Sequence, residues 1–226
     1  MAKTINGIID RLIFVFFLLV ISFGVYVLMD SYYVRHISSG DTFRVFRPDE
    51  STQGAYASLS DEAIGWITVD GTNIDYPIMQ AEDNIKYLDT APDGTHSLSG
   101  SIFLDHSCDP DFQMPFSLIY GHHMAKEQMF GALDLFSNKN YFDSHTEATL
   151  TFGNKMHTSK IFAFMTCNAN QKIIFDPAHE TGQYEYIKNN ATFFNEPWNK
   201  EHIVALSTCK DPGSTERTVL FLSFEN

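Results

Sequence analysis

The stretch HIVALSTCKDPGSTERTVLFLSF, residues 202–224, contains two apolar runs that read as neighbouring β-strands. Residues 202–209 form the first run and residues 217–224 the second, and both are rich in side chains that favour strands. The linker KDPGSTE contains Pro-Gly, which suits a turn. In an antiparallel hairpin, Cys209 would face Arg217 with Cα atoms about 4.5–5.5 Å apart. We therefore expect a thiol and a guanidinium at one end of a sheet.

This pairing would favour nucleophilic chemistry. A cysteine thiol has a pKa near 8.5 in free solution, and nearby positive charge favours the reactive thiolate. A guanidinium stays protonated and offers several donors in a planar fork, so it could stabilise an oxyanion, where one donor is worth about 3–4 kcal/mol. The alternative readings are structural: Cys209 as a buried small hydrophobe and Arg217 as a solvated charge at a strand start.

A general acid/base is the missing component, and SLIYGHHM (residues 117–124) supplies the best candidate. There an apolar strand runs into Gly121 and then His122, and catalytic side chains are commonly held where a strand passes into a loop. His123 is the rival. Neighbouring strand residues point to opposite faces, so we expect only one of the two histidines to face Cys209. An ordinary turn histidine is the structural alternative.

The rest of the chain beyond residue 60 alternates short apolar runs with turn residues. GWITVDGTNIDYPIM (65–79) reads as a hairpin, and further runs rich in Ile, Val, Phe and Thr follow at 99–105, 116–122, 148–153 and 159–168. Helical spacing is expected at 124–136 and 181–196. The pattern predicts a mainly β (α+β) fold, a closed or nearly closed barrel with helices on its rim.

The N-terminus contains an uncharged apolar run at residues 12–29, which would rise about 27 Å as a helix and could cross a bilayer. A cleaved signal peptide is the alternative, but the run is long and no small-x-small cleavage pattern follows. We expect a short cytoplasmic N-terminus (1–11), a transmembrane signal-anchor (12–29), a stalk with short helices (30–60) and a single barrel domain (61–226). A helix start is expected at SLSDE, residues 58–62.

Charge and cysteine content limit the possible partners. The chain carries a formal charge of −13, and because residues 1–29 contribute +1, the remainder carries −14. An acidic domain of this kind argues against nucleic acid or an anionic membrane surface as its main partner. Lys3 and Arg11 before the apolar run weakly favour export of the remainder. The cysteines lie far apart without a C-x-x-C pair, so no metal site is expected, and a Cys108–Cys167 disulfide stays open.

The motifs taken together resemble those of the sortases, the cysteine transpeptidases of Gram-positive cell surfaces. LSTC (206–209) followed eight residues later by Arg217 resembles the sortase T-L-x-T-C…R signature. The segments at 65–88 and 100–105 and IYGHHM (119–124) look like sortase landmarks in the usual order. A helical insert at 181–196, between the sixth and seventh strands, looks like the class B subfamily. The resemblance implies a closed barrel of about eight strands with N-terminal helices.

The resemblance also implies roles for particular residues. Cys209 would be the nucleophile, His122 the general acid/base and Arg217 the cation that orients substrate and stabilises the oxyanion. The substrate-binding groove would include four further residues, Asn84, Leu88, Tyr120 and Ser207. Lys210 departs from the pattern, because some class B relatives carry an acidic residue there. No cofactor or metal is implied.

The implied reaction joins exported proteins to the cell wall through a thioacyl-enzyme. The expected partners are the C-terminal sorting signals of surface proteins, a lipid-linked peptidoglycan precursor amine, and the membrane through the N-terminal helix. The expected location is the cell membrane, with one span and an extracellular catalytic domain. A hydrolytic cysteine peptidase of the cell envelope would use the same residues with water as acceptor. A membrane-anchored binding module in which Cys209 only packs is the non-enzymatic alternative.

Overall fold

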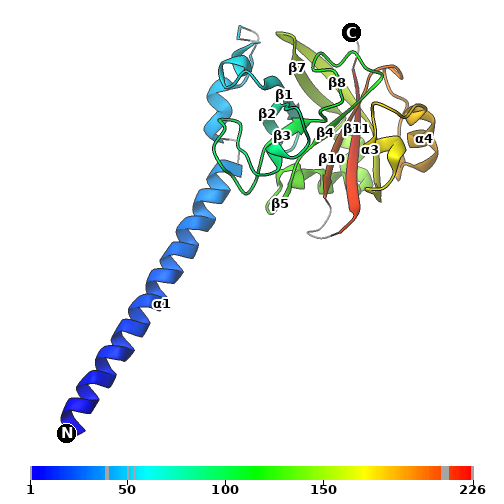
Figure 1. The fold of residues 1–226 in the computed structure, drawn as a ribbon. Coiled ribbons are helices and arrows are strands. Elements are labelled where there is room, and N and C mark those ends of the chain that lie inside the picture. The colour runs from blue at the N-terminus through cyan, green and yellow to red at the C-terminus, as the bar shows by residue number, and fades with distance from the viewer. Residues whose placement is uncertain (1, 39–40, 50, 53, 210–213, 225–226) are drawn as a thin grey trace. The chain divides into compact units, whose positions relative to one another are not determined.

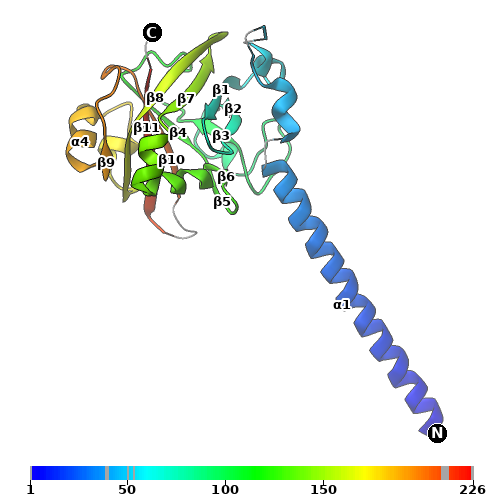
Figure 2. The same cartoon turned by 180° about the vertical axis from the view of Figure 1, so that it is seen from behind.

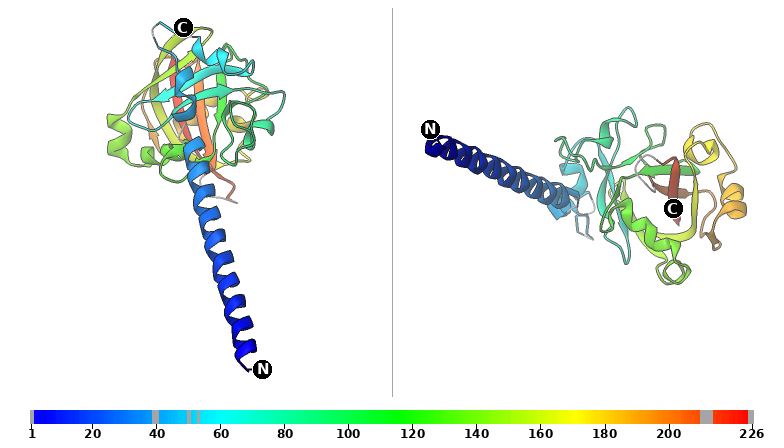
Figure 3. Two further views of the ribbon diagram at one scale, coloured as in Figure 1. Left: turned by 90° about the vertical axis from the view of Figure 1, so that its left-hand side faces the viewer. Right: turned by 90° about the horizontal axis from the view of Figure 1, so that it is seen from below.

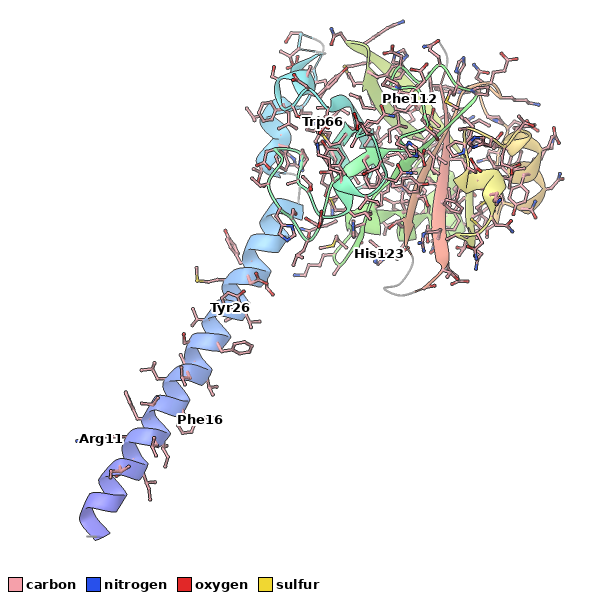
Figure 4. All side chains as sticks on the ribbon, viewed as in Figure 1. Arg11, Phe16, Tyr26, Trp66, Phe112 and His123 are labelled. Carbon is pink, nitrogen blue, oxygen red and sulfur yellow. The ribbon has the colours of Figure 1, made fainter. Side chains whose placement is uncertain are left out.

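The computed structural model describes residues 2–38, 41–49, 51–52, 54–209 and 214–224. The chain divides into two compact units, Met1–His36 and Ile37–Asn226. The first unit consists of helix α1 (Ala2–Ser38) except for the last two residues of that helix. Within it, Gly7–Tyr32 is long and apolar enough to cross a membrane, and its side chains, such as Phe16 and Tyr26 in Figure 4, are exposed. By length and composition a signal sequence would pass the same test.

The second unit is built on one large sheet that closes on itself (Figure 1). Its eight barrel strands are β1 (Ala63–Val69), β2 (Asp75–Met79), β3 (Ile102–Leu104), β4 (Phe116–Tyr120), β7 (Glu147–Phe152), β8 (Lys155–Asn168), β10 (Ile203–Cys209) and β11 (Glu216–Phe224). The hydrogen-bonded order is β11-β10-β4-β3-β2-β1-β7-β8, and β11 also pairs with β8 to complete the ring. A short strand outside this ring, β9 (Phe193–Phe194), pairs with β8 in antiparallel register.

The barrel is mixed rather than purely antiparallel. β2 pairs with β3, and β10 pairs with β4, in parallel register, whereas the other described pairs are antiparallel. Closure leaves no free edge among the eight barrel strands, so their backbone groups are paired without exposing a template for aggregation. The predicted closed barrel of about eight strands is confirmed, as are the expected hairpins β1–β2 and β10–β11.

Two hydrophobic clusters lie on opposite faces of the sheet, because successive strand residues point to opposite sides. In β11, Leu220 and Leu222 join the larger cluster, which fills the barrel together with η4. Val219 and Phe221 of the same strand join a second cluster under the helical segment that follows β8. This two-sided burial explains why the run read as continuously apolar in the sequence.

Helical segments cover this barrel at two places. The 3-10 helix η4 (Phe130–Ser137) and helix α2 (Lys139–Ser144) precede β7, and α2 is capped by the side chain of Asn138. Helices α3 (Lys172–Phe175) and α4 (Gln183–Asn190) lie between β8 and β10, beside β9 on the outside of the barrel (Figures 2 and 3). Counted along the chain, β8 and β10 are the sixth and seventh barrel strands, so the expected insert is present.

The N-terminal part of the second unit packs against the β1–β2 hairpin. The 3-10 helices η1 (Asp41–Phe46) and η2 (Ala55–Ser58) lie here. Arg47 pairs with Asp75 at 3.0 Å, and Asp75 also accepts a 2.8 Å hydrogen bond from the indole Nε1 of Trp66. Short helices were expected in this region.

The expected helix start at residues 58–62 is wrong. Ser60 does form a local cap, because its hydroxyl accepts a hydrogen bond from the Glu62 amide. The amide of Ala63 donates to the carbonyl of Ser60, which closes a turn, and β1 follows at once. Serine stabilises turns and helix starts by the same side-chain contact, so the sequence signal was ambiguous.

The two expected helical inserts are shorter than predicted. Residues 123–129 form a small hairpin, β5 (His123–Met124) with β6 (Gln128–Met129), and the helix η4 begins only at Phe130. The hairpin turn has positive φ at Lys126 and Glu127, a conformation that cannot continue a helix. In the insert at 181–196, α4 ends at Asn190, and the chain then pairs with β8 through β9.

Candidate active site

The parallel pairing of β4 with β10 places two functional strand ends at one edge of the barrel. Tyr120, the last residue of β4, is the register partner of Ser207 in β10. The amide of Gly121 donates a 3.1 Å hydrogen bond to the carbonyl of Ser207, which extends this pairing beyond the strand. Because parallel strands run in the same direction, His122 after β4 and Cys209 at the end of β10 come to the same edge.

The hairpin β10–β11 supplies the third element at this edge. Cys209 and Arg217 are register partners, as the sequence predicted. The structure describes the backbone of Cys209 and the residues up to it. Lys210 and the expected Pro-Gly turn lie outside the described residues.

A cavity of about 260 Å³ opens at this edge. It is lined by Asn84, Leu88, Phe103, Tyr120, Gly121, His122, Ser207, Thr208 and Arg217. Six of the seven residues singled out from the sequence therefore line one cavity. The seventh, Cys209, follows Thr208 in the chain and is paired with Arg217, both of which are in its wall.

The two neighbouring histidines have different surroundings. His122 lines the cavity, and its Nε2 is buried without a hydrogen-bond partner in the part of the chain that the structure describes. Burial lowers the pKa of His122, and a hydrogen bond with the backbone of Leu88 acts in the opposite direction. His123, labelled in Figure 4, instead places Nε2 at 2.8 Å from the carboxylate of Asp134. A buried imidazole, whose neutral form is favoured by burial, is a group that can exchange a proton with a molecule bound in the cavity.

The backbone around His122 is held tightly. The amide of Phe130 donates a 3.0 Å hydrogen bond to the carbonyl of His122. A side chain on Gly121 would place Cβ only 2.5 Å from Cδ1 of Ile102 and 2.7 Å from Cδ2 of Phe130. Glycine is therefore required at position 121, because the strand end and η4 approach too closely for a larger residue.

Arg217 is oriented by the chain next to it. Its Nη1 donates to the carbonyl of Ser214 at 3.0 Å and to the carbonyl of Glu216 at 3.1 Å. These two bonds use one of the guanidinium nitrogens, which leaves further donors on the planar group for a bound molecule. The guanidinium is thus fixed at the cavity wall before any ligand binds.

The segment between β2 and β3 brings Asn84 and Leu88 to the cavity. Leu88 ends the short 3-10 helix η3 (Lys86–Leu88), and Tyr87 fixes this helix because its hydroxyl donates a 2.6 Å hydrogen bond to Glu62. Asn84 is half-buried, and its Nδ2 donates to Asp105 at 2.8 Å. These contacts are long-range in sequence, so no local pattern could have placed either residue in the cavity wall.

The other two cysteines are free thiols, so the open possibility of a Cys108–Cys167 disulfide does not apply. Burial raises the pKa of the Cys108 thiol to about 12 and that of Cys167 to about 11. Cys167 has a basic neighbour that the sequence does not reveal. It is the register partner of Arg217 across the β8–β11 pairing, so Arg217 lies between Cys167 and Cys209 in the sheet.

Sequence reasoning missed four residues of this region. Phe103, Gly121 and Thr208 line the cavity, and Asp105 lies behind it as a buried carboxylate. The sequence does give an indication for Asp105, because this residue ends the apolar run SGSIFLD. An acidic residue next to such a run is rarely buried unless its side chain has partners. Phe103 and Thr208 are ordinary strand residues and Gly121 directly follows β4, so the position of all three depends on the barrel.

Comparison with known proteins points to one family. No protein-family model matches the sequence. Sortase B of Listeria monocytogenes is 29% identical over 157 residues, which cover 67% of this chain and 64% of the Listeria protein. Sortase B of Staphylococcus aureus is 27% identical over 172 residues, covering 72% of this chain and 70% of that protein. The chain thus spans about two thirds of the length of these curated relatives.

Solved structures agree with the sequence comparison. A class B sortase of Streptococcus pyogenes has a TM-score of 0.68 and 34% identity, and the match covers 75% of this chain and 96% of that one. Sortase B of Clostridium perfringens has a TM-score of 0.67 and 26% identity, covering 79% of this chain and all of that one.

The fold and the cavity define a mixed β-barrel protein whose cysteine, histidine and arginine come from three strand ends at one rim. The chain belongs to the sortase family, and within that family it is most like the class B members.

Proposed function

We propose that this protein is a cysteine transpeptidase that cleaves a sorting signal and transfers the acyl part to an amine. The observation that carries the proposal is the arrangement at the rim of the cavity: Cys209 is paired with Arg217, and His122, which lines the same cavity, has a buried Nε2 with no hydrogen-bond partner among the described residues. Nucleophile, acid/base and oxyanion donor are the three groups that acyl transfer needs. The class B sortase relatives support the same reaction type.

In the first half-reaction, the sulfur of Cys209 attacks the carbonyl carbon of the scissile peptide bond, and the proton of its thiol passes to His122. The oxyanion that forms is stabilised by the guanidinium of Arg217. When the C–N bond breaks, His122 gives a proton to the departing amine, and a thioacyl-enzyme remains.

In the second half-reaction, an amine attacks the thioester carbonyl. His122 removes a proton from this amine, the C–S bond breaks, and a new amide bond forms as the thiolate of Cys209 leaves. A neutral His122 is required at this step, and burial favours the neutral form. In this proposal the amine belongs to a peptidoglycan precursor, and the acyl donor to an exported protein.

Helix α1 supports a location of the protein in the cell membrane. A helix over Gly7–Tyr32 is long enough to span the hydrocarbon core of a bilayer. We infer a single-pass membrane protein with its catalytic domain outside the cell, close to exported substrates and to lipid-linked wall precursors. The charge of −14 on residues 30–226 is compatible with an amine-bearing acceptor.

The experiment that tests the proposal uses the full-length protein in detergent. Wild type and Cys209→Ala are incubated with a panel of sorting-signal peptides and an excess of triglycine as the amine, and proteins and products are followed by mass spectrometry. We expect an acyl adduct that depends on Cys209 and resolves into a peptide–triglycine product. Peptides that are cleaved only by the wild type identify the recognised signal.

Two other outcomes separate the alternatives. Cleavage that gives only the free acid in the presence of excess amine would favour a hydrolytic cysteine peptidase, which has the same residues but water as the acceptor. If wild type binds a peptide as well as Cys209→Ala does but no cleavage occurs, a binding module in which Cys209 only packs is the better description.

A further inference from the structure

Behind the cavity lies a buried carboxylate that the proposed reaction does not use. Asp105 directly follows β3, and its side chain is buried, with only 3% of the residue exposed. A buried charge is costly unless it is fully hydrogen-bonded. The hydrogen-bond partners of Asp105 therefore indicate which side chains the carboxylate holds in place.

The two carboxylate oxygens of Asp105 have different partners. Oδ1 accepts hydrogen bonds from the amide and the hydroxyl of Ser107, at 2.9 Å and 2.6 Å, which closes a local turn. Oδ2 accepts from Nδ2 of Asn84 at 2.8 Å and from the hydroxyl of Tyr120 at 3.1 Å. Asn84 and Tyr120 both line the cavity, so one oxygen atom connects two of its walls.

The position of Asp105 itself is set by groups outside the cavity. Its amide donates to the carbonyl of Leu118 at 2.8 Å, and its carbonyl accepts a 3.0 Å hydrogen bond from Nε2 of Gln80. The same Nε2 also donates to the carbonyl of Cys108 at 2.8 Å, which ties down the loop after β3. Asp105 is therefore a fixed reference point for the side chains that bind to it.

The bond to Asp105 fixes which way the Asn84 amide faces. Nδ2 donates to Asp105, while Oδ1 accepts a 2.9 Å hydrogen bond from the amide of His106. Reversing the amide would place two acceptors together at one end and two donors at the other. Because an amide nitrogen carries two N–H groups, Asn84 keeps a second donor available for a bound peptide.

The same carboxylate keeps Tyr120 a donor. Burial, and then the negative charge of Asp105, raise the pKa of the Tyr120 hydroxyl well above its usual range, so this hydroxyl stays protonated. The ring of Tyr120 is packed against Phe103, with centroids 5.4 Å apart, and both rings are in the cavity wall. The hydrogen bond to Asp105 and the contact with Phe103 together fix the position of the Tyr120 side chain in the cavity wall.

We propose that Asp105 is a positioning residue that sets the peptide-binding geometry of the cavity by holding Asn84 and Tyr120 on a single carboxylate oxygen. This inference rests on the proposed function, because it assumes that the cavity binds a peptide. It predicts an effect on substrate binding rather than on the chemical step, since Asp105 contacts neither His122 nor Arg217 among its described hydrogen bonds.

The test is Asp105→Asn in the full-length protein in detergent. An amide offers one acceptor oxygen where the carboxylate offers two, so it cannot serve Ser107 on one side and Asn84 with Tyr120 on the other. We expect KM for the cleaved peptide to rise about tenfold while kcat stays within about twofold. Peptide affinity measured by fluorescence anisotropy in the non-reacting Cys209→Ala protein should fall by a similar factor.

Asp75→Asn is the matched control. Asp75 is also a carboxylate with several hydrogen bonds, from Trp66 and Thr68, but it lies in the β1–β2 hairpin and outside the cavity wall. A loss of general stability would appear in both variants, whereas the change in KM should appear only in Asp105→Asn. A double-mutant cycle adds specificity: Tyr120→Phe should cost less affinity in the Asp105→Asn protein than in wild type.

Two readouts keep this inference separate from the proposed function. If wild type cleaves the peptide and Asp105→Asn has unchanged KM and affinity, the positioning role is wrong and the transpeptidase proposal stands. If wild type neither binds nor cleaves any peptide, the proposed function is wrong. The side-chain amide resonances of Asn84, assigned by NMR with Asn84→Ala, then test Asp105 directly: resonances that do not move in Asp105→Asn would overturn the positioning role.

Discussion

His122 and His123 are neighbours in the chain, yet only His122 lines the cavity and has a buried ring nitrogen with no hydrogen-bond partner among the described residues. The Nε2 of His123 lies 2.8 Å from a carboxylate oxygen of Asp134 instead. The chain turns out of β4 at Gly121, and β5 begins at His123, so the two side chains leave the strand end in different directions. The geometry therefore favours His122 over its neighbour as the acid/base.

We expect His122→Ala to lower kcat for peptide cleavage by about 10²–10⁴-fold, which is the usual contribution of a general acid/base. His123→Ala should retain activity within a few-fold, because it removes only the contact with Asp134. Steady-state cleavage of the best peptide measures both. Loss of activity in His123→Ala together with normal activity in His122→Ala would reverse the assignment.

The lowered pKa of His122 has a consequence for stability. Burial disfavours the protonated ring in the folded state, so below the ordinary histidine pKa of about 6.5 the unfolded chain binds more protons than the folded one. Stability should therefore fall as the pH drops below about 6.5. We expect His122→Gln to flatten the decline of Tm between pH 7 and pH 5. An unchanged slope in His122→Gln would contradict the effect.

Arg217→Lys should lower kcat/KM by about 100-fold or more. An ammonium group cannot hold two backbone carbonyls and still present a planar fork to an oxyanion, and one lost oxyanion donor costs about 3–4 kcal/mol. Arg47→Lys is the matched control, because Arg47 pairs with Asp75 outside the cavity wall. Near-normal turnover by Arg217→Lys would remove Arg217 from its proposed role.

Thiol alkylation tests which cysteine is the nucleophile. Burial raises the pKa of Cys108 to about 12 and that of Cys167 to about 11, so neither thiol supplies much thiolate at neutral pH. Rapid modification by iodoacetamide at pH 7.5 should therefore disappear in Cys209→Ala and persist in Cys108→Ser and Cys167→Ser. Peptide mapping locates the adduct. Fast labelling of Cys167 in wild type would instead indicate that Cys167, which pairs with Arg217 from β8, is the reactive thiol.

Gly121→Ala should destabilise the protein by about 1–3 kcal/mol, because the added carbon would press on Ile102 and Phe130 in a packed region. The strand end would have to move, so we also expect a loss of activity through His122. Chemical denaturation and peptide cleavage measure the two effects. Gly24→Ala, where an added carbon meets nothing within 4 Å, should change neither. A fully stable and active Gly121→Ala would contradict the close packing.

Local sequence patterns were sufficient for the hairpins and for one pair of site residues. Alternating and β-branched runs on either side of a turn are signals within about 20 residues, so β1–β2 and the Cys209–Arg217 pairing could be predicted. The motif resemblance correctly indicated the barrel and its insert between β8 and β10. Local patterns gave a wrong prediction where one motif is compatible with two structures. At Ser60 the side chain caps a turn that leads into strand β1, and not a helix start.

The sequence by itself determined the strand-forming runs, the apolar helix near the N-terminus, and the order of Asn84, His122, Cys209 and Arg217 along the chain. Tertiary structure alone decided that Tyr120 lies beside Ser207, that Cys167 lies across from Arg217, and that Asp105 holds Asn84. These contacts join segments separated by 21 or more residues. They depend on the parallel β4–β10 pairing and on closure of β11 onto β8, which follow from burying both faces of the sheet together.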